Sequence, residues 1–379
     1  MLKRLLAVFT ATLLTLATYA YAAELVQDHP STYTVVKGDT LWDISARFLK
    51  KPWLWPEIWQ ANPQVKNPHL IYPGDVLSLV YINGQPVMSM APSGPHVGLA
   101  INAVPLAQIE PFLRKLSVID DVKSMPYIIG LEDDRLLSAS GQLVYVRGLV
   151  GAQPGQLVQI VRPIHRYTRD RDSIHSSTLD FRGDKIHRDY DPEDRAWHEL
   201  WTDYTRGERN GYAGTEVMQQ ATGEVTHVKG EIATVLLAGE EREARVGDRV
   251  MPLDPQPYDL QFFPQPPTSP IPPDALVLAS ADGLYGAGPN EVVALSIGSS
   301  DGVKNGTTFS IWHGGAIRPD TVAHRNEFKQ RADSVQMPDE FVGHVMVFRT
   351  FDKVSYGLIM DAIKPAYVGD LLKHPDATE

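Results

Sequence analysis

The hydrophobic pattern of residues 31–80 predicts a small unit of two strands and two helices. Tyr33 and Val35 alternate with polar residues, as in a half-buried strand, and residues 76–79 form a second apolar run. Between them, apolar side chains recur at helical spacing, with Leu41, Ile44 and Phe48 in one segment and Trp55, Ile58 and Trp59 in the next. Two helices covering one face of a two-stranded sheet make a minimal layered fold.

Local signals place the ends of these two helices. Thr40 and Asp43 have the spacing of a capping box, so the first helix is predicted to begin after Thr40. Pro56 suits the first turn of the second helix, and Asn62-Pro63 should end it.

The tryptophans of this unit differ in their predicted roles. Trp42, Trp55 and Trp59 lie on the apolar stripes and are predicted to be core residues. Trp53 lies in the connection between the helices, off either stripe, and is predicted to be an exposed aromatic residue.

Short alternating segments dominate the chain beyond residue 125 and predict strands, for example at 142–148 and 156–161. An internal repeat is also visible. Gly155–Ile160 resembles Gly306–Ile311, Gly223–Val228 resembles Gly343–Phe348, and Val246–Val250 resembles Val368–Leu372. Two copies of one small β unit explain these matches most simply. Gln142 departs from the pattern, because an Asp is expected at its position.

The predicted fold class is α+β, with a small βααβ unit followed by a mainly-β region built of two related small β units. The predicted divisions are a signal peptide at 1–22, the βααβ unit at 31–80, a linker with a short helix at 81–124, a first β unit at 125–253, a Pro-rich connector at 254–273 and a second β unit at 274–379. Two polar insertions, 166–190 and 313–339, are predicted to be surface excursions that are partly disordered.

The N-terminus has the order of a secretory signal peptide. Lys3 and Arg4 precede an apolar run, and Ala20-Tyr21-Ala22 offers a small-residue cleavage site. The apolar run is shorter than the roughly 20 residues that span a bilayer, so cleavage is favoured over a transmembrane anchor. The sequence therefore predicts an exported protein of the periplasm, associated with the cell wall, without a transmembrane helix after signal removal.

Composition excludes several classes of function. The chain has no Cys, which removes disulfide frameworks, thiolate metal sites and cysteine nucleophiles. Its net charge of -11 argues against nucleic-acid binding, which requires a basic surface.

Two common metalloenzyme motifs are also missing from the sequence. The H-E-x-x-H and H-x-H spacings are absent. The histidines at 165, 175, 187 and 198 are too widely spaced for a known metal site and are predicted to be solvated. The sequence thus predicts a protein that is not an enzyme and has no metal or other cofactor.

Residues 31–80 resemble a LysM domain. The resemblance rests on Tyr33-x-Val35, the run from Gly38 to Trp42, and Leu70-Ile71-Tyr72-Pro73-Gly74. LysM domains bind N-acetylglucosamine polymers, chiefly the glycan strands of peptidoglycan, in a shallow groove between two loops. Carried over to this sequence, the resemblance implies a glycan-binding groove formed by Gly38, Asp39, Thr40, Leu41, Asn67, Pro68, His69, Leu70 and Ile71.

The whole chain is similar to LysM proteins associated with type IV pilus secretins, whose C-terminal half resembles a flagellar outer-membrane-ring protein. This similarity rests on the segment from Gly141 to Gly148 and on the two Val-Gly-Asp closures. It implies a non-enzymatic anchor that links an outer-membrane secretin ring to peptidoglycan. The alternatives are a cell-wall remodelling hydrolase or hydrolase activator, and a wall-binding protein without a secretin partner.

Overall fold

The fold is that of a computed structural model of the chain. It describes residues 24–60, 71–82, 85–90, 109–110, 112–113, 115–168, 212–239, 242–253, 263–280, 286–319 and 334–378. Contacts divide the chain into a small unit, Met1–Pro105 with Phe263–Gln265, and a large unit, Leu106–Phe262 with Pro266–Glu379. Each unit is described by itself.

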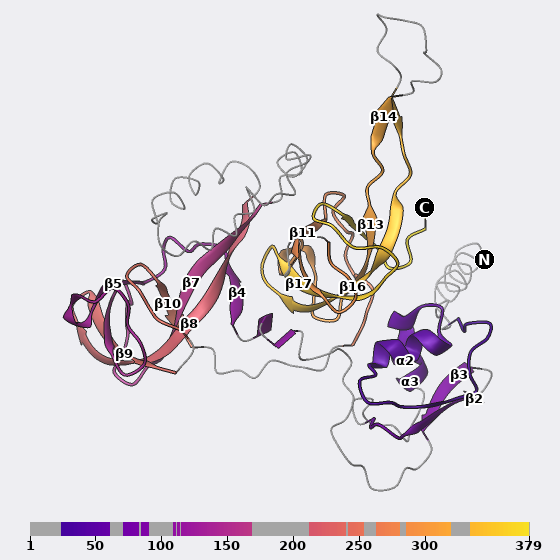
Figure 1. Cartoon of the computed structure of the whole chain (residues 1–379), viewed down its shortest axis with the longest axis horizontal. Coiled ribbons are helices and arrows are strands. Elements are labelled where there is room, and N and C mark those ends of the chain that lie inside the picture. The colour runs from indigo at the N-terminus through magenta and orange to yellow at the C-terminus, as the bar shows by residue number, and fades with distance from the viewer. Residues whose placement is uncertain are drawn as a thin grey trace, which may run out of the picture. The chain divides into compact units, whose positions relative to one another are not determined.

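The described residues of the small unit form three strands and three short helices (Figure 1). They are β1 (Thr32–Thr34), α2 (Leu41–Phe48), the 3₁₀ helix η1 (Pro52–Leu54), α3 (Trp55–Gln60), β2 (Val76–Ile82) and β3 (Gln85–Met90). The strands form one antiparallel sheet in the order β1-β2-β3. The N-terminal region is therefore the expected strand and helix unit, with one strand more.

Helix α2 begins where the sequence predicts. The Thr40 hydroxyl accepts a hydrogen bond from the Asp43 backbone N–H, and the Asp43 carboxylate accepts one from the Thr40 backbone N–H, which completes a capping box. Pro56 lies in the first turn of α3, as expected. The predicted end of that helix at 62–63 lies outside the described residues.

The prediction for three of the tryptophans is confirmed, and that for the fourth is wrong. Trp42, Trp55 and Trp59 are buried. Trp53 is also buried, and its ring lies 6.3 Å from that of Trp42. The short η1 helix turns the connection back onto the core. The apolar spacing of the two flanking helices does not predict this turn.

Strand β3 occupies a segment that the sequence predicts to be linker. Pro86 and Gly84 suggested a break, but β3 is an edge strand, where proline is tolerated. Val87 and Met88 are buried, so the strand adds to the core. Phe263 also belongs to this unit, with its ring 5.6 Å from that of Trp55, although the sequence places it in the Pro-rich connector.

The first half of the large unit is a sheet that closes on itself, here called sheet 1. Its elements are β4 (Leu116–Ile119), β5 (Tyr127–Leu131), the 3₁₀ helix η2 (Glu132–Asp134), β6 (Leu143–Arg147), β7 (Leu157–Thr168), β8 (Tyr212–Lys229), β9 (Ile232–Ala238) and β10 (Arg249–Pro252). The pairing runs β8-β7-β10-β5-β6-β9 and returns to β8, while β4 lies on the other side of β8.

The second half contains sheet 2, which also closes. Its elements are β11 (Val277–Ser280), β12 (Val292–Leu295), the 3₁₀ helix η4 (Ser299–Asp301), β13 (Thr308–His313), β16 (Glu340–Thr350), β17 (Ser355–Ala362) and β18 (Leu371–Lys373). The pairing runs β11-β12-β17-β16-β13-β18. It is closed by hydrogen bonds from the Val277 N–H to the Asp370 carbonyl and from the Leu372 N–H to the Ala275 carbonyl, both 2.9 Å.

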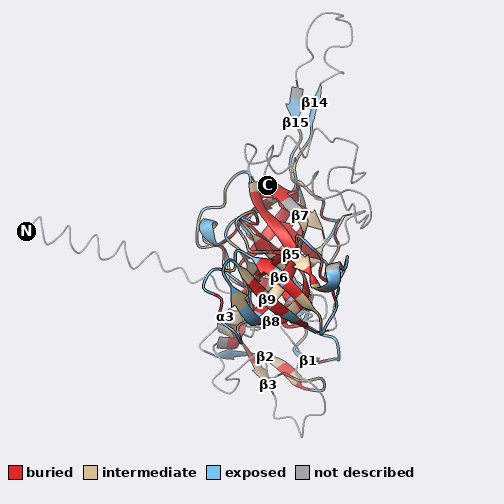
Figure 2. Cartoon of the chain, turned by 90° about the vertical axis from the view of Figure 1, so that its left-hand side faces the viewer, coloured by how far each residue is buried: buried red, intermediate tan, exposed pale blue. Residues whose placement is uncertain are grey.

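The two closed sheets pair their strands in the same order. When β4 is left out of sheet 1, the first strand along the chain of each sheet pairs with the second and the sixth, and the second pairs with the fifth. Each encloses its own apolar core, which includes Val144 and Val235 in sheet 1 and Val293 and Ile359 in sheet 2. Figure 2 shows buried residues in red, concentrated in the strands of the sheets.

One type of tight turn recurs before equivalent strands. A residue with positive φ is followed by a side chain that accepts a hydrogen bond from a backbone N–H three residues earlier. In sheet 1 the accepting residues are Gln142, Gln156 and Asp248, and in sheet 2 they are Glu291, Thr307 and Asp370. Gln142, the apparent exception in the repeat, makes the same contact through its amide oxygen.

The two predicted insertions contain more regular structure than expected. Strand β7 extends to Thr168, while residues 169–190 lie outside the described part of the chain. Within 313–339, β14 (Ile317–Pro319) pairs with β15 (Ser334–Gln336) and continues the β13–β16 hairpin as a ribbon (Figure 1). Polar composition concealed this ribbon, because its described side chains are exposed and no buried face imposes an apolar alternation on them.

A polar seam joins the two sheets within the large unit. The Tyr167 hydroxyl of β7 and the Tyr356 hydroxyl of β17 donate to the same Glu216 oxygen, at 2.9 and 2.5 Å. Glu216 lies on β8 and is buried. Burial raises the pKa of its carboxyl, against the opposing effect of the two hydrogen bonds.

The predicted short helix before sheet 1 lies in the same seam. Residues 109–110 and 112–113 are helical. Arg349 of β16 donates to the carbonyl of Leu113 at 2.9 Å and also to those of Phe112 and Leu116, as expected for a cation at a helix C-terminus. The Phe112 ring lies 5.6 Å from that of Tyr356.

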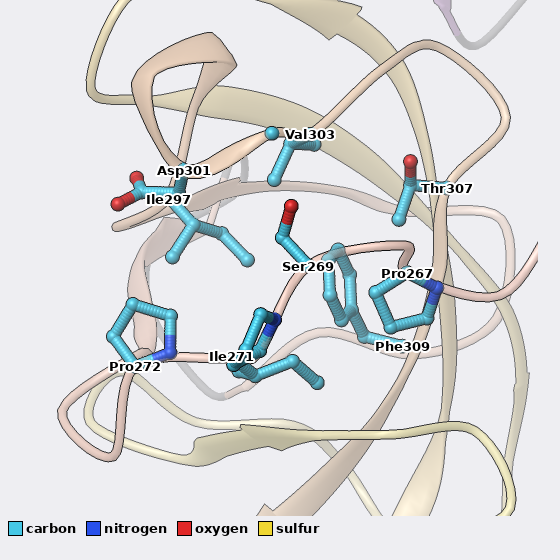
Figure 3. Close-up of a pocket in the computed structure, with 11 residues that line it drawn as sticks. Pro267, Ser269, Ile271, Pro272, Ile297, Asp301, Val303, Thr307 and Phe309 are labelled. Carbon is cyan, nitrogen blue, oxygen red and sulfur yellow. The ribbon is translucent and has the colours of Figure 1, made fainter.

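The described part of the Pro-rich connector lies over sheet 2. Pro267, Ser269 and Ile271 line a small pocket together with Ile297 and Phe309 (Figure 3). Residues 254–262 of the connector lie outside the described part of the chain.

Candidate functional site

The loop between β1 and α2 forms the described half of the predicted groove. Gly38 has φ 101°, a left-handed conformation that favours glycine, and is exposed. Asp39 follows it, and its carboxylate accepts a hydrogen bond from the Val36 N–H at 2.8 Å. The loop is therefore the same Gly-Asp turn that recurs in the two closed sheets.

A second Gly-Asp turn holds this loop against the chain that enters β2. Gly74 has φ 98°, and the buried Asp75 accepts from the Tyr72 N–H at 2.9 Å. Val35 links the two loops, since its N–H donates to the Asp75 carbonyl at 2.9 Å and its carbonyl accepts from the Gly74 N–H at 2.8 Å. The backbone of both loops is thus fixed before any ligand arrives.

Asp39 is also part of a small polar stack on the surface. The Tyr33 hydroxyl donates to its carboxylate at 2.9 Å, and the Arg47 guanidinium lies 4.7 Å from the centre of the Tyr33 ring. Burial and the bond to Asp39 raise the pKa of Tyr33. Tyr33 and Arg47 were not among the predicted site residues, although the Tyr33-x-Val35 motif could have suggested the tyrosine.

Three of the predicted groove residues turn their side chains inward. Leu41 and Ile71 have no exposed surface, and Thr40 is 8% exposed with its hydroxyl engaged in the capping box. These residues can offer a ligand their backbone or the shape of the groove wall. Asn67, Pro68, His69 and Leu70 lie outside the described residues, so their predicted role stays a prediction.

The fold and the paired Gly-Asp loops can be compared with known proteins. Residues 33–80 match the LysM domain family. This match indicates peptidoglycan binding and a cell-wall-associated protein. It spans the small unit from β1 to β2, whereas β3 lies beyond it.

One curated relative shares part of the sequence. The chain is 38% identical over 60 residues to the uncharacterized protein YqbP of Bacillus subtilis (strain 168). The matched part covers 13% of this chain and only 27% of that protein. The similarity therefore concerns one module rather than the whole of either chain.

Sheet 2 brings together one row of residue types that could suggest catalysis. Ser310, His344 and Asp361 lie opposite one another on adjacent strands, and His344 Nδ1 is 2.8 Å from the Asp361 carboxylate. Ser310 is fully buried, donates to the His374 carbonyl at 2.7 Å and accepts from the Trp312 indole at 2.9 Å. Its hydroxyl is thus engaged in two internal hydrogen bonds and is buried, so a substrate cannot reach it.

Titratable groups elsewhere give no metal site among the described residues. His165, predicted to be solvated, is instead packed against Tyr167 with ring centres 4.8 Å apart. Burial lowers its pKa to about 4. The histidines at 175, 187 and 198 lie outside the described residues. No helix in the described part of the chain is long and apolar enough to cross a bilayer.

Proposed function

We propose that this chain is a non-enzymatic periplasmic protein that binds peptidoglycan glycan strands through its LysM module and anchors an outer-membrane secretin of the type IV pilus class to the cell wall. The binding half of this proposal is supported most by the loop from Val36 to Asp39. An exposed glycine backbone lies there beside a carboxylate that already bonds the Tyr33 hydroxyl. Such backbone and carboxylate groups suit the amides and hydroxyls of N-acetylglucosamine.

The glycan site can be tested at Asp39. Asp39→Asn keeps an oxygen that can accept from the Val36 N–H and so preserves the turn, but it removes the charge that a sugar hydroxyl would contact. We expect a loss of about tenfold in affinity for insoluble peptidoglycan, equivalent to one charged hydrogen bond. Asp28→Asn is the matched control, because Asp28 is an exposed acid of the small unit that lies outside the groove. Equal sedimentation of the two variants would reject this site.

Thr40 is unsuitable for such a test because it supports the fold. Loss of its capping hydroxyl should cost about 1 kcal/mol of stability. A binding defect in Thr40→Ala would therefore mix folding with recognition.

The secretin half of the proposal rests on the resemblance of the C-terminal sequence to secretin-associated LysM proteins. A single shallow LysM groove is expected to bind weakly, and copies arrayed on a ring would gain avidity of the order of 10² to 10⁴. The test is purification of the tagged full chain from detergent-solubilised envelopes. Enrichment of the secretin is expected, and a preparation without it would reject this partner.

The non-enzymatic part is tested by a zymogram on purified cell wall. We expect no lysis band from the full chain. A clear band that disappears in Ser310→Ala or His344→Ala would overturn the proposal in favour of a hydrolase.

We also propose that sheets 1 and 2 are two copies of one ancestral β unit. The support is the common pairing order together with the recurrent turns that precede equivalent strands. A shared origin makes the two sheets directly comparable, strand by strand.

A further inference from the structure

Equivalent outer faces of the two sheets differ in burial. In sheet 2, the outward positions of β12 and β17 are at most 7% exposed; they are Val292, Ala294, Tyr356, Leu358 and Met360. In sheet 1, the equivalent strands are β6 and β9, with β5 beside them. Among the outward residues of these strands, Ile129, Tyr145 and Leu236 are between 36% and 44% exposed. Sheet 1 thus has an exposed apolar face, whereas the equivalent face of sheet 2 is buried.

Within the chain, an extended hairpin contacts the covered face. Strands β7 and β8 continue beyond the closed part of sheet 1, pairing as far as Thr168 with Tyr212. This extension bears Tyr167 and Glu216, and Glu216 accepts the hydrogen bond of Tyr356 on β17. A hairpin extending from one sheet therefore packs on the outer face of the other.

Sheet 2 has the equivalent hairpin, but no such contact is made by its extension within the part of the chain that the structure describes. Strands β13 and β16 correspond to β7 and β8, and β14 and β15 prolong them as a two-stranded ribbon (Figure 1). Ile317 is 69% exposed and Val335 45% exposed on this ribbon. Figure 2 shows the same segment in the colour of exposed residues. Isolated two-stranded ribbons are marginally stable in water and gain stability from a further packing surface.

We propose that the β14–β15 ribbon of one chain docks on the β5–β6–β9 face of a second copy. The occupant is a second copy because each chain offers both halves of a contact that it already makes once internally. Charge is also complementary, since Arg318 lies on the ribbon while the acidic turn Glu132–Asp134 follows β5. The inference is independent of glycan binding.

Such a contact joins two different surfaces, so it is heterologous. Heterologous contacts produce rings when the rotation closes and filaments when it does not. Val335 and Arg318 are paired and share one face of the ribbon, whereas Ile317 lies on the other face. Docking through the Val335 face would cover Val335 and Arg318 together with the apolar residues of the receiving face. The ribbon is then the polymerising element of the protein.

The absence of cysteine from the sequence allows a direct crosslinking test on the chain without residues 1–22. Val335→Cys and Leu236→Cys chains are mixed and treated with a short bismaleimide. Val150→Cys replaces Leu236→Cys in the control, because Val150 is 97% exposed and lies outside the proposed face. We expect at least about tenfold more mixed dimer with Leu236→Cys, since docking raises the effective concentration of the paired thiols. Equal yields from the two mixtures would overturn the proposal.

A second measurement uses no added thiols. The unmodified chain should sediment as species larger than a monomer as its concentration is raised, and Ile317→Asp with Val335→Asp should lose them. Both replaced residues are exposed, so the fold should persist, which circular dichroism checks. A chain that stays monomeric, or oligomers that survive the double substitution, would contradict the inference. Either failure, with sacculus binding retained, leaves the proposed glycan function intact.

Discussion

Sheets 1 and 2 have the same strand order and the same turns, but their outer faces differ in how far they are buried. Inside each sheet, apolar residues alternate along the strands because both interiors must be filled. Outside, Tyr356 is buried against Phe112 and Glu216, whereas Tyr145 remains partly exposed. Pairing order thus determines the interior, while neighbouring segments determine which outer face becomes core.

The largest expected difference between the sheets is at these two tyrosines. Tyr356→Ala should cost about 3–5 kcal/mol of unfolding free energy, because it empties a buried site. It also removes one of the two donors to Glu216. Tyr145→Ala should cost less than about 1 kcal/mol, as its ring is already partly in water. Urea denaturation of the full chain measures both. Similar costs would show that the faces do not differ as described.

His165 packs against Tyr167 of the seam and should also make stability depend on pH. Burial lowers its pKa to about 4 from 6.5, so the folded state favours the neutral ring. This contribution is complete above pH 6.5 and is lost as the pH falls towards 4, by up to about 3 kcal/mol. His165→Asn should flatten that part of the profile, measured as unfolding free energy against pH.

Glu216 acts in the opposite direction and provides the control. Because its folded pKa is raised, its contribution is complete at low pH and is lost as the pH rises through the folded value. Glu216→Gln should therefore steepen the loss of stability on acidification. An unchanged profile in both variants would contradict the buried seam.

The recurrent turns predict equal, smaller effects in the two sheets. Gly247 and Gly369 have φ of 91° and 93°, so an alanine at either position should cost about 1–2 kcal/mol. Gly288→Ala is the control, since its backbone is outside the left-handed region and an added Cβ meets nothing within 4 Å. Thermal unfolding compares the three variants. Markedly unequal costs at Gly247 and Gly369 would argue against equivalence of the turns.

Local signals were sufficient for much of the LysM module. The capping box at Thr40, the two helical stripes and the turn at Gly74 are short-range features that specify their own geometry. The repeated Val-Gly-Asp segments likewise predicted two related units, and the two closed sheets have matching order. These predictions depend on residues close together in sequence.

Features that depend on distant contacts were missed. Trp53 was expected to be exposed, but η1 turns it into the core, and β3 was hidden by Pro86 at a sheet edge. The ribbon of β14 and β15 lacked the apolar alternation that reveals a strand. In the groove, Tyr33 and Arg47 join Asp39 only through the fold.

Sedimentation of the full chain with purified sacculi tests the central claim most directly. The protein should appear in the pellet and be released by soluble N-acetylglucosamine oligomers in a concentration-dependent way. A chain that remains in the supernatant, or a pellet indifferent to the competing sugar, would contradict attachment to the cell wall through the LysM module.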